Sequence, residues 1–490
     1  MTISGVIIVF IIYFGILIAV SRLTADREST NSAFFTGDRR SPWIVVAYGM
    51  IGTLLSGVTF MSVPGYVRES GFTYLGVVLG NFVGVFVIAF LLLPLYYRLN
   101  LTSIYSYLRE RFGARSEKSG AFLFIISRLV GSALRMYLVV FILYEFFFRQ
   151  AGIPFFLLAA VLIGLILLYT FRGGIKTVVW TDVMQTTAML LALAGTVYIL
   201  LTGMGCPVSE VLNDAGANGM MTVYDSDWRS PTFFWKQFFS GVASMIAMTG
   251  LDQDMMQKNL SCENLKSAQK NMTLTAVLLL LINTLFLILG VLLIYYSDRN
   301  NMTLPDKSDA IFSTIALSAN GVSAVLFIVG LVAAGFSSAD GSLTSLTTSF
   351  CINILDFEKN TARSEKRKTG IRKSVHVVFA FLFFLIIVVF KPFHSDSIIS
   401  TIFKIAGFTY GPLLGMFSFG MIMKERSVYD RAVPYIAIIS PVASFFMDRY
   451  SENLLFGYHF GFEIMLLNAL LTFIGLLIFS KKCPAKQKKQ

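Results

Sequence analysis

The segment GLVAAGFSSADGSLTSLTTS, residues 330–349, mixes small apolar residues with hydroxyl groups and a carboxylate. On a helix, Ala334 and Ser338 share one stripe, Ser337 flanks it, and Asp340 lies about 60° around from Ser337. A hard cation such as Na⁺ takes hydroxyl, carbonyl and carboxylate oxygens as ligands. The segment therefore indicates half of a sodium site. The alternative is that the hydroxyls bond back to carbonyls of their own helix.

A second segment, GTLLSGVTF at residues 52–60, is rich in glycines and hydroxyls, and Pro64 follows it. Such a stretch can interrupt a membrane helix and free backbone carbonyls that must find partners. In transporters, carbonyls of this kind coordinate Na⁺ near the middle of the membrane. The alternative is a small-residue face for helix packing. The presence of both segments in one chain favours a shared sodium site.

Arg128, Arg135 and Asp182 also fall inside apolar stretches, where charge is costly and usually functional. Arg128 and Arg135 are seven residues apart and share a helix face. Either guanidinium suits bidentate binding of a substrate carboxylate. The alternative is a structural pair with Asp182 or with backbone carbonyls. Asp182 itself suits a cation site, or else a buried salt bridge.

Composition identifies the elements that must hold these residues. The chain has 490 residues, 56% of them hydrophobic and 14% charged, with a mean hydropathy of +0.71. Apolar runs of about 20 residues recur, each long enough to cross a bilayer. They lack the alternation of a transmembrane barrel. The sequence therefore predicts an all-α polytopic membrane protein.

We expect about 13 transmembrane helices, near residues 2–21, 43–65, 71–97, 119–148, 152–171, 174–204, 232–251, 271–297, 321–355, 374–391, 396–423, 432–448 and 455–480. One set of alternate connections carries 29 Lys and Arg residues and the other carries 7. The positive-inside rule predicts an external N-terminus and a cytoplasmic C-terminus, in the plasma or inner membrane. It also accounts for the net charge of +12 without nucleic acid.

Other classes of protein are disfavoured. The four cysteines are scattered without a CxxC pair, which disfavours a disulfide framework or a metal centre. The three histidines are equally dispersed, so no catalytic constellation is evident, and we expect no enzyme and no organic cofactor. The first apolar segment lacks a basic leading region and a cleavage site, so we expect it to be retained.

Three motifs resemble the sodium:solute symporter family. They are GGIKTVVWTDVMQ at 173–185, TGLDQDMMQKNL at 249–260, where Lys258 replaces the usual arginine, and VAAGFSSADGSL at 332–343. The likeness covers roughly residues 2–480. It implies a LeuT-like fold within one transporter domain, 1–490. Its parts would be an extra helix at 2–21, five-helix inverted repeats at 43–204 and 232–423, and two last helices at 432–480.

The resemblance also implies site residues. The main sodium site would use carbonyls of Gly52, Leu55 and Ala334 and hydroxyls of Ser337 and Ser338. Some members have a second sodium site, built from the aspartate that matches Asp182 and a pair of serines. In this chain that pair falls on Asp340 and Gly341, although Asp340 could itself supply charge.

For the substrate, LLSGVTF resembles the sialic-acid and monocarboxylate branches of the family. By that resemblance, Ser56, Thr59 and either Arg135 or Arg128 would hold a carboxylate, and Asn81 would reach sugar hydroxyls. The leucines before Ser56 count against proline as the substrate.

Together these observations predict a sodium-coupled symporter of a small organic solute, a sugar acid such as sialic acid. We expect the lipid bilayer and the solute to be its partners, with no nucleic acid and no obligatory protein. Alternatives are coupled transport of a neutral sugar, monocarboxylate or vitamin, proton coupling through Asp182 or Asp340, and a membrane sensor that kept the transporter fold.

Overall fold

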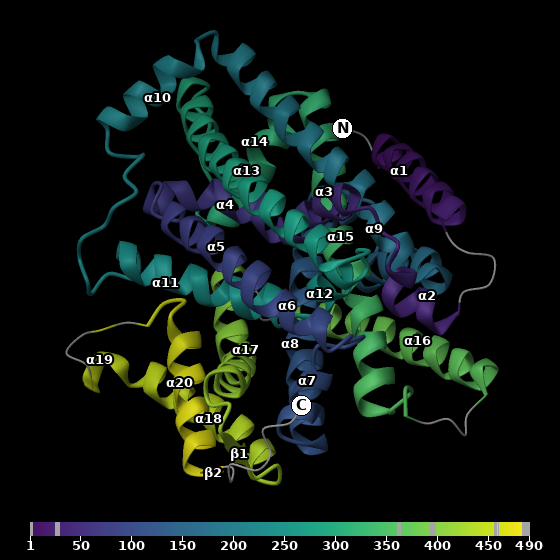
Figure 1. Ribbon diagram of the computed structural model, residues 1–490. Coiled ribbons are helices and arrows are strands. Elements are labelled where there is room, and N and C mark those ends of the chain that lie inside the picture. The colour runs from purple at the N-terminus through teal and green to yellow at the C-terminus, as the bar shows by residue number, and fades with distance from the viewer. Residues whose placement is uncertain are drawn as a thin grey trace.

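The structure, a computed structural model, is built almost entirely from helices (Figure 1). It describes residues 3–24, 30–359, 364–391, 398–454, 458 and 460–482. Within these ranges, eight helices are long and apolar enough to cross a membrane, or nine if the bent pair Trp43–Leu54 and Gly57–Ser70 is one span. Every one of the thirteen predicted spans coincides with helix, so that number is compatible with the structure. Residues 2, 396–397, 455–457 and 459 of those spans lie outside the described part.

The elements of the first half are α1 (Ile3–Thr24), α2 (Asn31–Thr36), η1 (Gly37–Arg39), α3 (Trp43–Leu54), α4 (Gly57–Ser70), α5 (Leu75–Val87), η2 (Ile88–Leu92), α6 (Leu93–Arg98), α7 (Ser106–Arg111), α8 (Ala114–Leu143), η3 (Tyr144–Phe148), α9 (Phe155–Met204) and α10 (Val208–Ala217).

The second half contains α11 (Phe234–Met245), η4 (Ile246–Gly250), α12 (Gln253–Leu260), α13 (Leu265–Arg299), η5 (Ser308–Ala310), α14 (Ile311–Ala319), α15 (Gly321–Ser349), η6 (Phe350–Ile354), α16 (Glu365–Phe390), α17 (Ile398–Ile422), β1 (Arg426–Val428), α18 (Val433–Arg449), α19 (Ser451–Leu454), α20 (Ile464–Ile478) and β2 (Ser480–Lys482). The strands β1 and β2 pair antiparallel and were not predicted.

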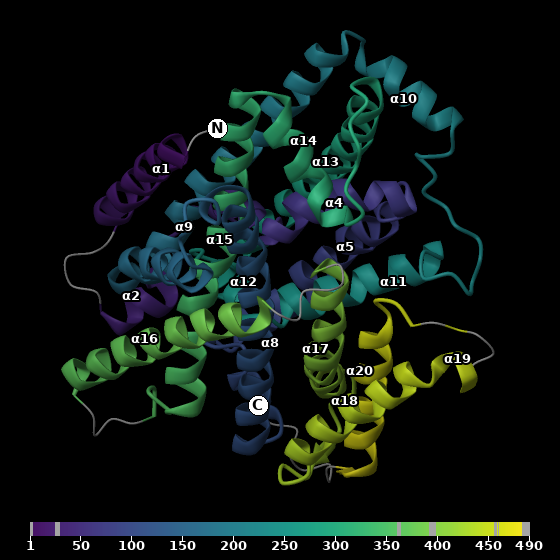
Figure 2. The same cartoon turned by 180° about the vertical axis from the view of Figure 1, so that it is seen from behind.

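Helix α15 lies at the centre of the molecule. It packs against α9, α8, α4, α3 and α16, and nearly all of its side chains from Phe327 to Ser349 are buried. Figures 1 and 2 show α1 along one side next to α9, whereas α17, α18 and α20 lie together at one end, where α17 packs against α8. One buried apolar cluster extends from Val6 to Leu476. The division into two inverted repeats stays a prediction.

Helix α9 contains two of the predicted spans, joined by a sharp bend. Gly174 has φ +56° and ψ −157°, a conformation that favours glycine. A Cβ at Gly174 would also lie 2.4 Å from the Cα of Phe34, so α2 packs directly onto the bend. The chain can therefore turn here and start the helix that carries Asp182.

Helices α5 and α11 cross closely because glycines face backbone on both sides. A Cβ at Gly80 would lie 2.0 Å from the carbonyl oxygen of Phe238, and one at Gly241 would lie 2.2 Å from that of Val77. Such close approach of two backbones is typical of small residues in membrane helices. The crossing positions Asn81 and Ser244 opposite one another.

We predict that Gly241→Ala lowers the melting temperature of the detergent-purified protein, because the new methyl group meets backbone that cannot move aside. Overpacking of this kind costs about 1–3 kcal/mol. Gly164→Ala on α9 is the matched control, since nothing lies within 4 Å of its Cβ position. Equal melting temperatures for the two variants would contradict the close crossing.

Candidate functional site

The second predicted span is interrupted in its middle. Helix α3 ends at Leu54 and α4 begins at Gly57, at 58° to each other. Between them, Leu55 (φ −88°, ψ 48°) and Ser56 (φ −45°, ψ 170°) have non-helical backbone. The last carbonyls of a helix have no donor within it, so the turn that includes Gly52 presents oxygens that need partners.

Helix α15 lies directly against this interruption. A Cβ at Gly52 would be 3.3 Å from Ser337 Oγ, and one at Gly57 would be 3.5 Å from Gly335 Cα. The Gly52 amide donates to Thr186 Oγ1 on α9 at 3.1 Å. The sequence predicts that the break and the Ala334–Ser338 turn of α15 form one sodium site. The structure places these two segments side by side.

The two serine hydroxyls of α15 have different surroundings. Ser337 Oγ donates to Asp182 Oδ1 at 2.6 Å, so its proton points to that carboxylate. Ser338 Oγ is buried and has no hydrogen-bond partner among the described residues. A buried hydroxyl without a partner is costly. Both oxygens keep lone pairs for a cation, so the residues present fit Na⁺.

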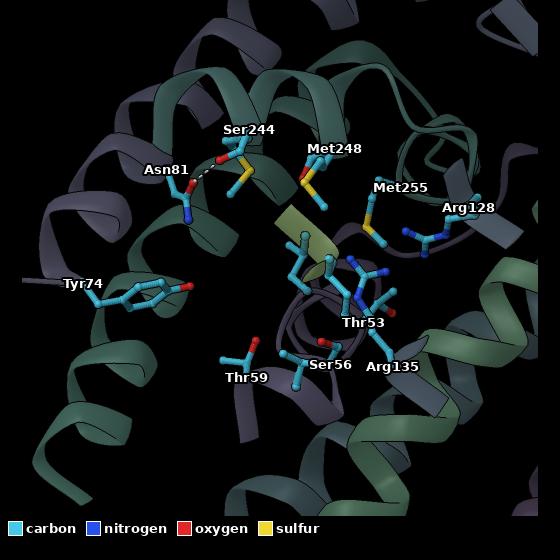
Figure 3. Close-up of a pocket in the computed structure, with 15 residues that line it drawn as sticks. Thr53, Ser56, Thr59, Tyr74, Asn81, Arg128, Arg135, Ser244, Met248 and Met255 are labelled. Carbon is cyan, nitrogen blue, oxygen red and sulfur yellow. Dashed lines mark hydrogen bonds between the residues drawn. The ribbon is translucent and has the colours of Figure 1, made fainter. Parts of the chain in front are cut away.

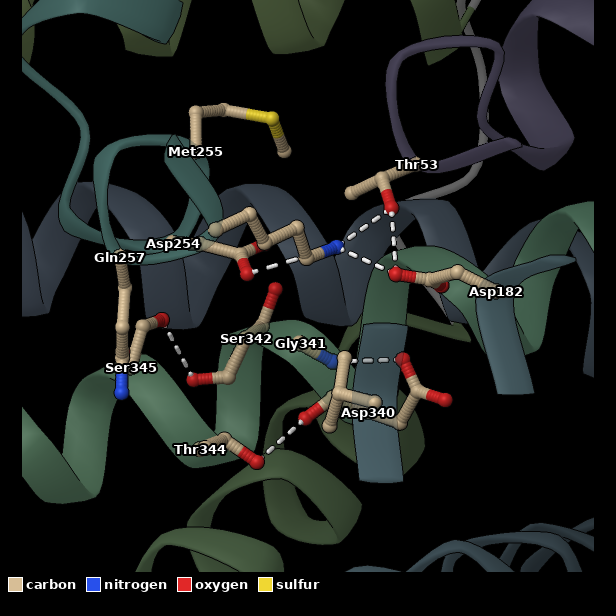
Figure 4. Close-up of polar contacts among 12 residues, drawn as sticks. Thr53, Asp182, Asp254, Met255, Gln257, Asp340, Gly341, Ser342, Thr344 and Ser345 are labelled. Atoms are coloured by element: carbon tan, nitrogen blue, oxygen red, sulfur yellow. Dashed lines mark hydrogen bonds and ion pairs between the residues drawn. The ribbon is translucent and has the colours of Figure 1, made fainter. Parts of the chain in front are cut away.

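Asp182 is fully buried and forms an ion pair with Lys258. The Lys258 Nζ lies 2.7 Å from Asp182 Oδ2 and 2.6 Å from Thr53 Oγ1, which is itself 3.2 Å from that Oδ2 (Figure 4). Nζ is also 3.7 Å from Asp254 Oδ1. Asp182 thus forms a buried salt bridge, which was the alternative to a cation site.

Arg128 and Arg135 differ in their partners. Arg128 is paired with Asp252 at 3.4 Å and with Asp254, and its Nε donates to Ser342 Oγ at 2.9 Å. Arg135 has no hydrogen bond or ion pair within the part of the chain that the structure describes, yet it is only partly exposed. Of the two guanidiniums, that of Arg135 is the one available to a ligand.

Asp340 is engaged by α9. Its Oδ2 accepts hydrogen bonds from Tyr169 at 2.9 Å and from Thr181 and Gln185 at 3.4 Å each. Its Oδ1 accepts from the Gly341 amide at 2.6 Å. No group of three or more His, Cys, Asp or Glu side chains suited to a metal occurs in the described ranges. Participation of Asp340 in a second sodium site stays a prediction.

A pocket opens beside the interruption, and all five predicted substrate residues line it (Figure 3). Figure 3 shows the Arg135 side chain reaching toward the middle of this space, with Ser56 and Thr59 on one side. Asn81 lies on the opposite wall, where Ser244 Oγ donates to its Oδ1 at 3.5 Å. The full lining is Thr53, Leu54, Ser56, Val58, Thr59, Tyr74, Asn81, Arg128, Arg135, Ser244, Met245, Met248, Thr249, Met255 and Ile402.

Sequence reasoning missed the role of Lys258, which it noted only as a departure from a motif. Two signals could have found it. An ion-pairing residue four positions after Asp254 lies on the same helix face. The buried carboxylates Asp182, Asp252 and Asp254 also need cations, and Arg128 alone cannot pair with all three. The apolar pocket wall of three methionines was not predicted either.

Comparison with known proteins gives one consistent result. The model of the sodium:solute symporter family matches residues 34–427. The chain is 26% identical to the sodium/sialic acid symporter NanT of Aliivibrio fischeri, over 88% of this chain and 85% of that one. It is 26% identical to the sodium/sialic acid symporter SiaT of Proteus mirabilis (91% and 90% covered), and 27% identical to the human sodium/iodide cotransporter (80% and 61%).

Solved structures share the fold. A substrate-bound, outward-open Na⁺-coupled sialic acid symporter superposes with a TM-score of 0.82 at 23% identity, covering 97% of this chain and 98% of that one. The nucleobase-cation-symport-1 transporter Mhp1, closed with bromovinylhydantoin bound, gives a TM-score of 0.57 at 14% identity, with 92% and 94% covered. The LeuT-like fold expected from sequence is confirmed.

We predict that Ser338→Ala reduces the thermal stabilisation that NaCl gives over choline chloride, because a ligand is lost. Melting temperature in choline chloride should not fall, since the variant removes an unpaired buried hydroxyl. Ser345→Ala is the control, because its hydroxyl already donates to the Ser342 carbonyl at 3.0 Å. An unchanged sodium effect in Ser338→Ala, or an equal loss in both variants, would argue against the site.

Proposed function

Because this chain belongs to the sodium:solute symporter family, we propose that it is a sodium-coupled symporter importing a carboxylate-bearing sugar acid, such as a sialic acid, by alternating access. The observation that carries the proposal is the Arg135 guanidinium, which lines the pocket without a counter-ion among the described residues. A guanidinium with no anion of its own is a ready partner for a carboxylate. The relatives named above for sialic acid support this choice.

The surroundings of Arg135 suit the rest of such a solute. Ser56 precedes α4 and makes no side-chain cap, so the first amides of that 14-residue helix can attract a negative group. The hydroxyls of Ser56 and Thr59 and the amide of Asn81 supply hydrogen bonds for sugar hydroxyls. Arg128, paired with two aspartates, would instead hold the pocket wall in place.

Sodium would bind beside this pocket, at carbonyls of Gly52, Leu55 and Ala334 and hydroxyls of Ser337 and Ser338. An ion there would bridge α3 and α15 and fix the start of α4, where the proposed solute ligands Ser56 and Thr59 lie. Sodium binding thereby favours solute binding, and release of both to the cytoplasm follows closure of the outer side. We infer that the chain transports without catalysing a reaction.

Orientation follows from charge. The connections with 29 Lys and Arg residues would face the cytoplasm, with the N-terminus outside and the C-terminus inside a plasma or inner membrane.

A compact monocarboxylate is the second candidate. Met245, Met248 and Met255 form an apolar wall of the pocket, which suits a small acid better than a polyhydroxylated sugar. Thermal-shift screening against sialic acids and short monocarboxylates, in sodium, separates the two.

Coupling predicts sodium-driven uptake into proteoliposomes. A sodium ion and a carboxylate anion together carry no net charge, so the sodium concentration gradient drives accumulation. A tenfold gradient corresponds to about 1.4 kcal/mol and to roughly tenfold accumulation of solute. Labelled sialic acid uptake should therefore require an inward sodium gradient. Replacing sodium by choline at a constant pH gradient should abolish it. Uptake that persists in choline and follows the pH gradient would favour proton coupling.

Arg135→Gln should weaken solute binding while sodium still binds. Loss of a charge-assisted hydrogen bond costs about 1.5–3 kcal/mol, so we expect roughly a 10- to 100-fold rise in the solute concentration for half-maximal uptake. Arg149→Gln is the control, since Arg149 lies at the end of the same span and pairs with Glu145 at the surface. Wild-type uptake by Arg135→Gln would rule out this residue as the carboxylate ligand.

A further inference from the structure

The carboxylate of Asp182 has the surroundings of a cation site, but it is already paired with a cationic side chain of the protein. It is fully buried, and hydroxyls of Thr53 and Ser337 lie next to it. A buried carboxylate without a counter-ion is strongly disfavoured. The Lys258 ammonium, 2.7 Å from Oδ2, supplies that charge. Both carboxylate oxygens are thus engaged, Oδ1 by Ser337 and Oδ2 by Lys258 and Thr53.

A second ion pair, with Asp254, holds Lys258 in position, and this pair depends on the absence of a side chain at Gly341. Lys258 lies one helical turn after Asp254, and its Nζ is 3.7 Å from Asp254 Oδ1. A Cβ at Gly341 would lie 2.5 Å from that same oxygen, so a side chain there would displace the Asp254 carboxylate. Gly341 therefore makes room for Asp254 and contributes no hydroxyl ligand of its own.

A sodium ion at Asp182 would have to displace the Lys258 ammonium or share the carboxylate with it. Two unit charges a few ångströms apart repel strongly in a buried site, where water does not screen them. The acid of α15, Asp340, accepts hydrogen bonds from Tyr169, Thr181 and Gln185 on α9. The main site needs neither carboxylate, because its proposed ligands are carbonyls and hydroxyls.

We propose that the Lys258 ammonium is a built-in counter-ion that excludes sodium from Asp182, so that this chain binds and couples one sodium ion. By neutralising Asp182, it also keeps that carboxylate as the acceptor of the Ser337 hydroxyl proton and leaves the Ser337 lone pairs for the sodium site. The inference rests on the proposed sodium coupling. It makes Lys258 a positioning residue that determines the number of ions.

The test is the number of ²²Na⁺ ions bound per purified protein at saturation, measured with the full chain. Wild type and Lys258→Arg, which keeps the charge, should bind one. Lys258→Gln leaves Asp182 without a counter-ion and should bind two, with a larger sodium-induced rise in melting temperature than wild type. Lys118→Gln, which removes a half-exposed lysine 3.8 Å from Asp356, should bind one.

Lys258→Gln is expected to be less stable without sodium, so Asp182→Asn/Lys258→Gln is measured beside it. The double variant removes both charges and should again bind one ion. Two ions on the wild type, or one on Lys258→Gln, would overturn the inference and leave sodium coupling intact. A wild type that binds no sodium at all would contradict the proposed function itself, and the inference with it.

Discussion

The site depends on the interruption of one helix within the apolar interior. Between Leu54 and Gly57 the chain gives up helical hydrogen bonds within an apolar part of the molecule. The oxygens freed there must be satisfied by a neighbour or an ion. Helix α15 comes close enough to do so because Gly335 meets Gly57, and Gly52 lies beside Ser337 and Thr186. The same break gives α4 an uncapped N-terminus at the pocket, so the proposed sodium site and the proposed solute site both depend on it.

Charge balance is the second constraint, and it gives the two arginines of α8 different partners. Asp252 caps α12 by accepting from the amides of Asp254 and Met255, and both aspartates pair with Arg128. Asp182 pairs with Lys258. With these carboxylates neutralised by the protein, Arg135 is left to face the pocket. A solute anion would complete the pairing, which would account for a cation that has no ion pair or hydrogen bond in the described chain.

Much of this could be predicted from sequence because membrane spans and intramembrane polar residues stand out against an apolar background. Hydropathy predicted thirteen spans, a number compatible with the structure, and oxygen chemistry predicted a shared site for Ser337, Ser338 and the 52–60 segment, which the structure brings side by side. Pairing within the core could not be predicted, because periodicity places a residue on a helix face without naming the helix opposite. Thus the partners of Arg128 and Arg135 could not be told apart, and Lys258 was noted only as a departure from a motif. The small β1–β2 sheet and the short helices between spans lack a hydropathy signal of their own.

The central claim is that sodium at the α3–α15 junction organises the pocket for the solute, so the two must bind cooperatively. Titration calorimetry of sialic acid, or of the best ligand from the screen, into purified protein at a series of sodium concentrations and constant ionic strength measures this directly. The account predicts that solute affinity rises with sodium until the ion site is saturated. A solute affinity that is the same in sodium and in choline would contradict it.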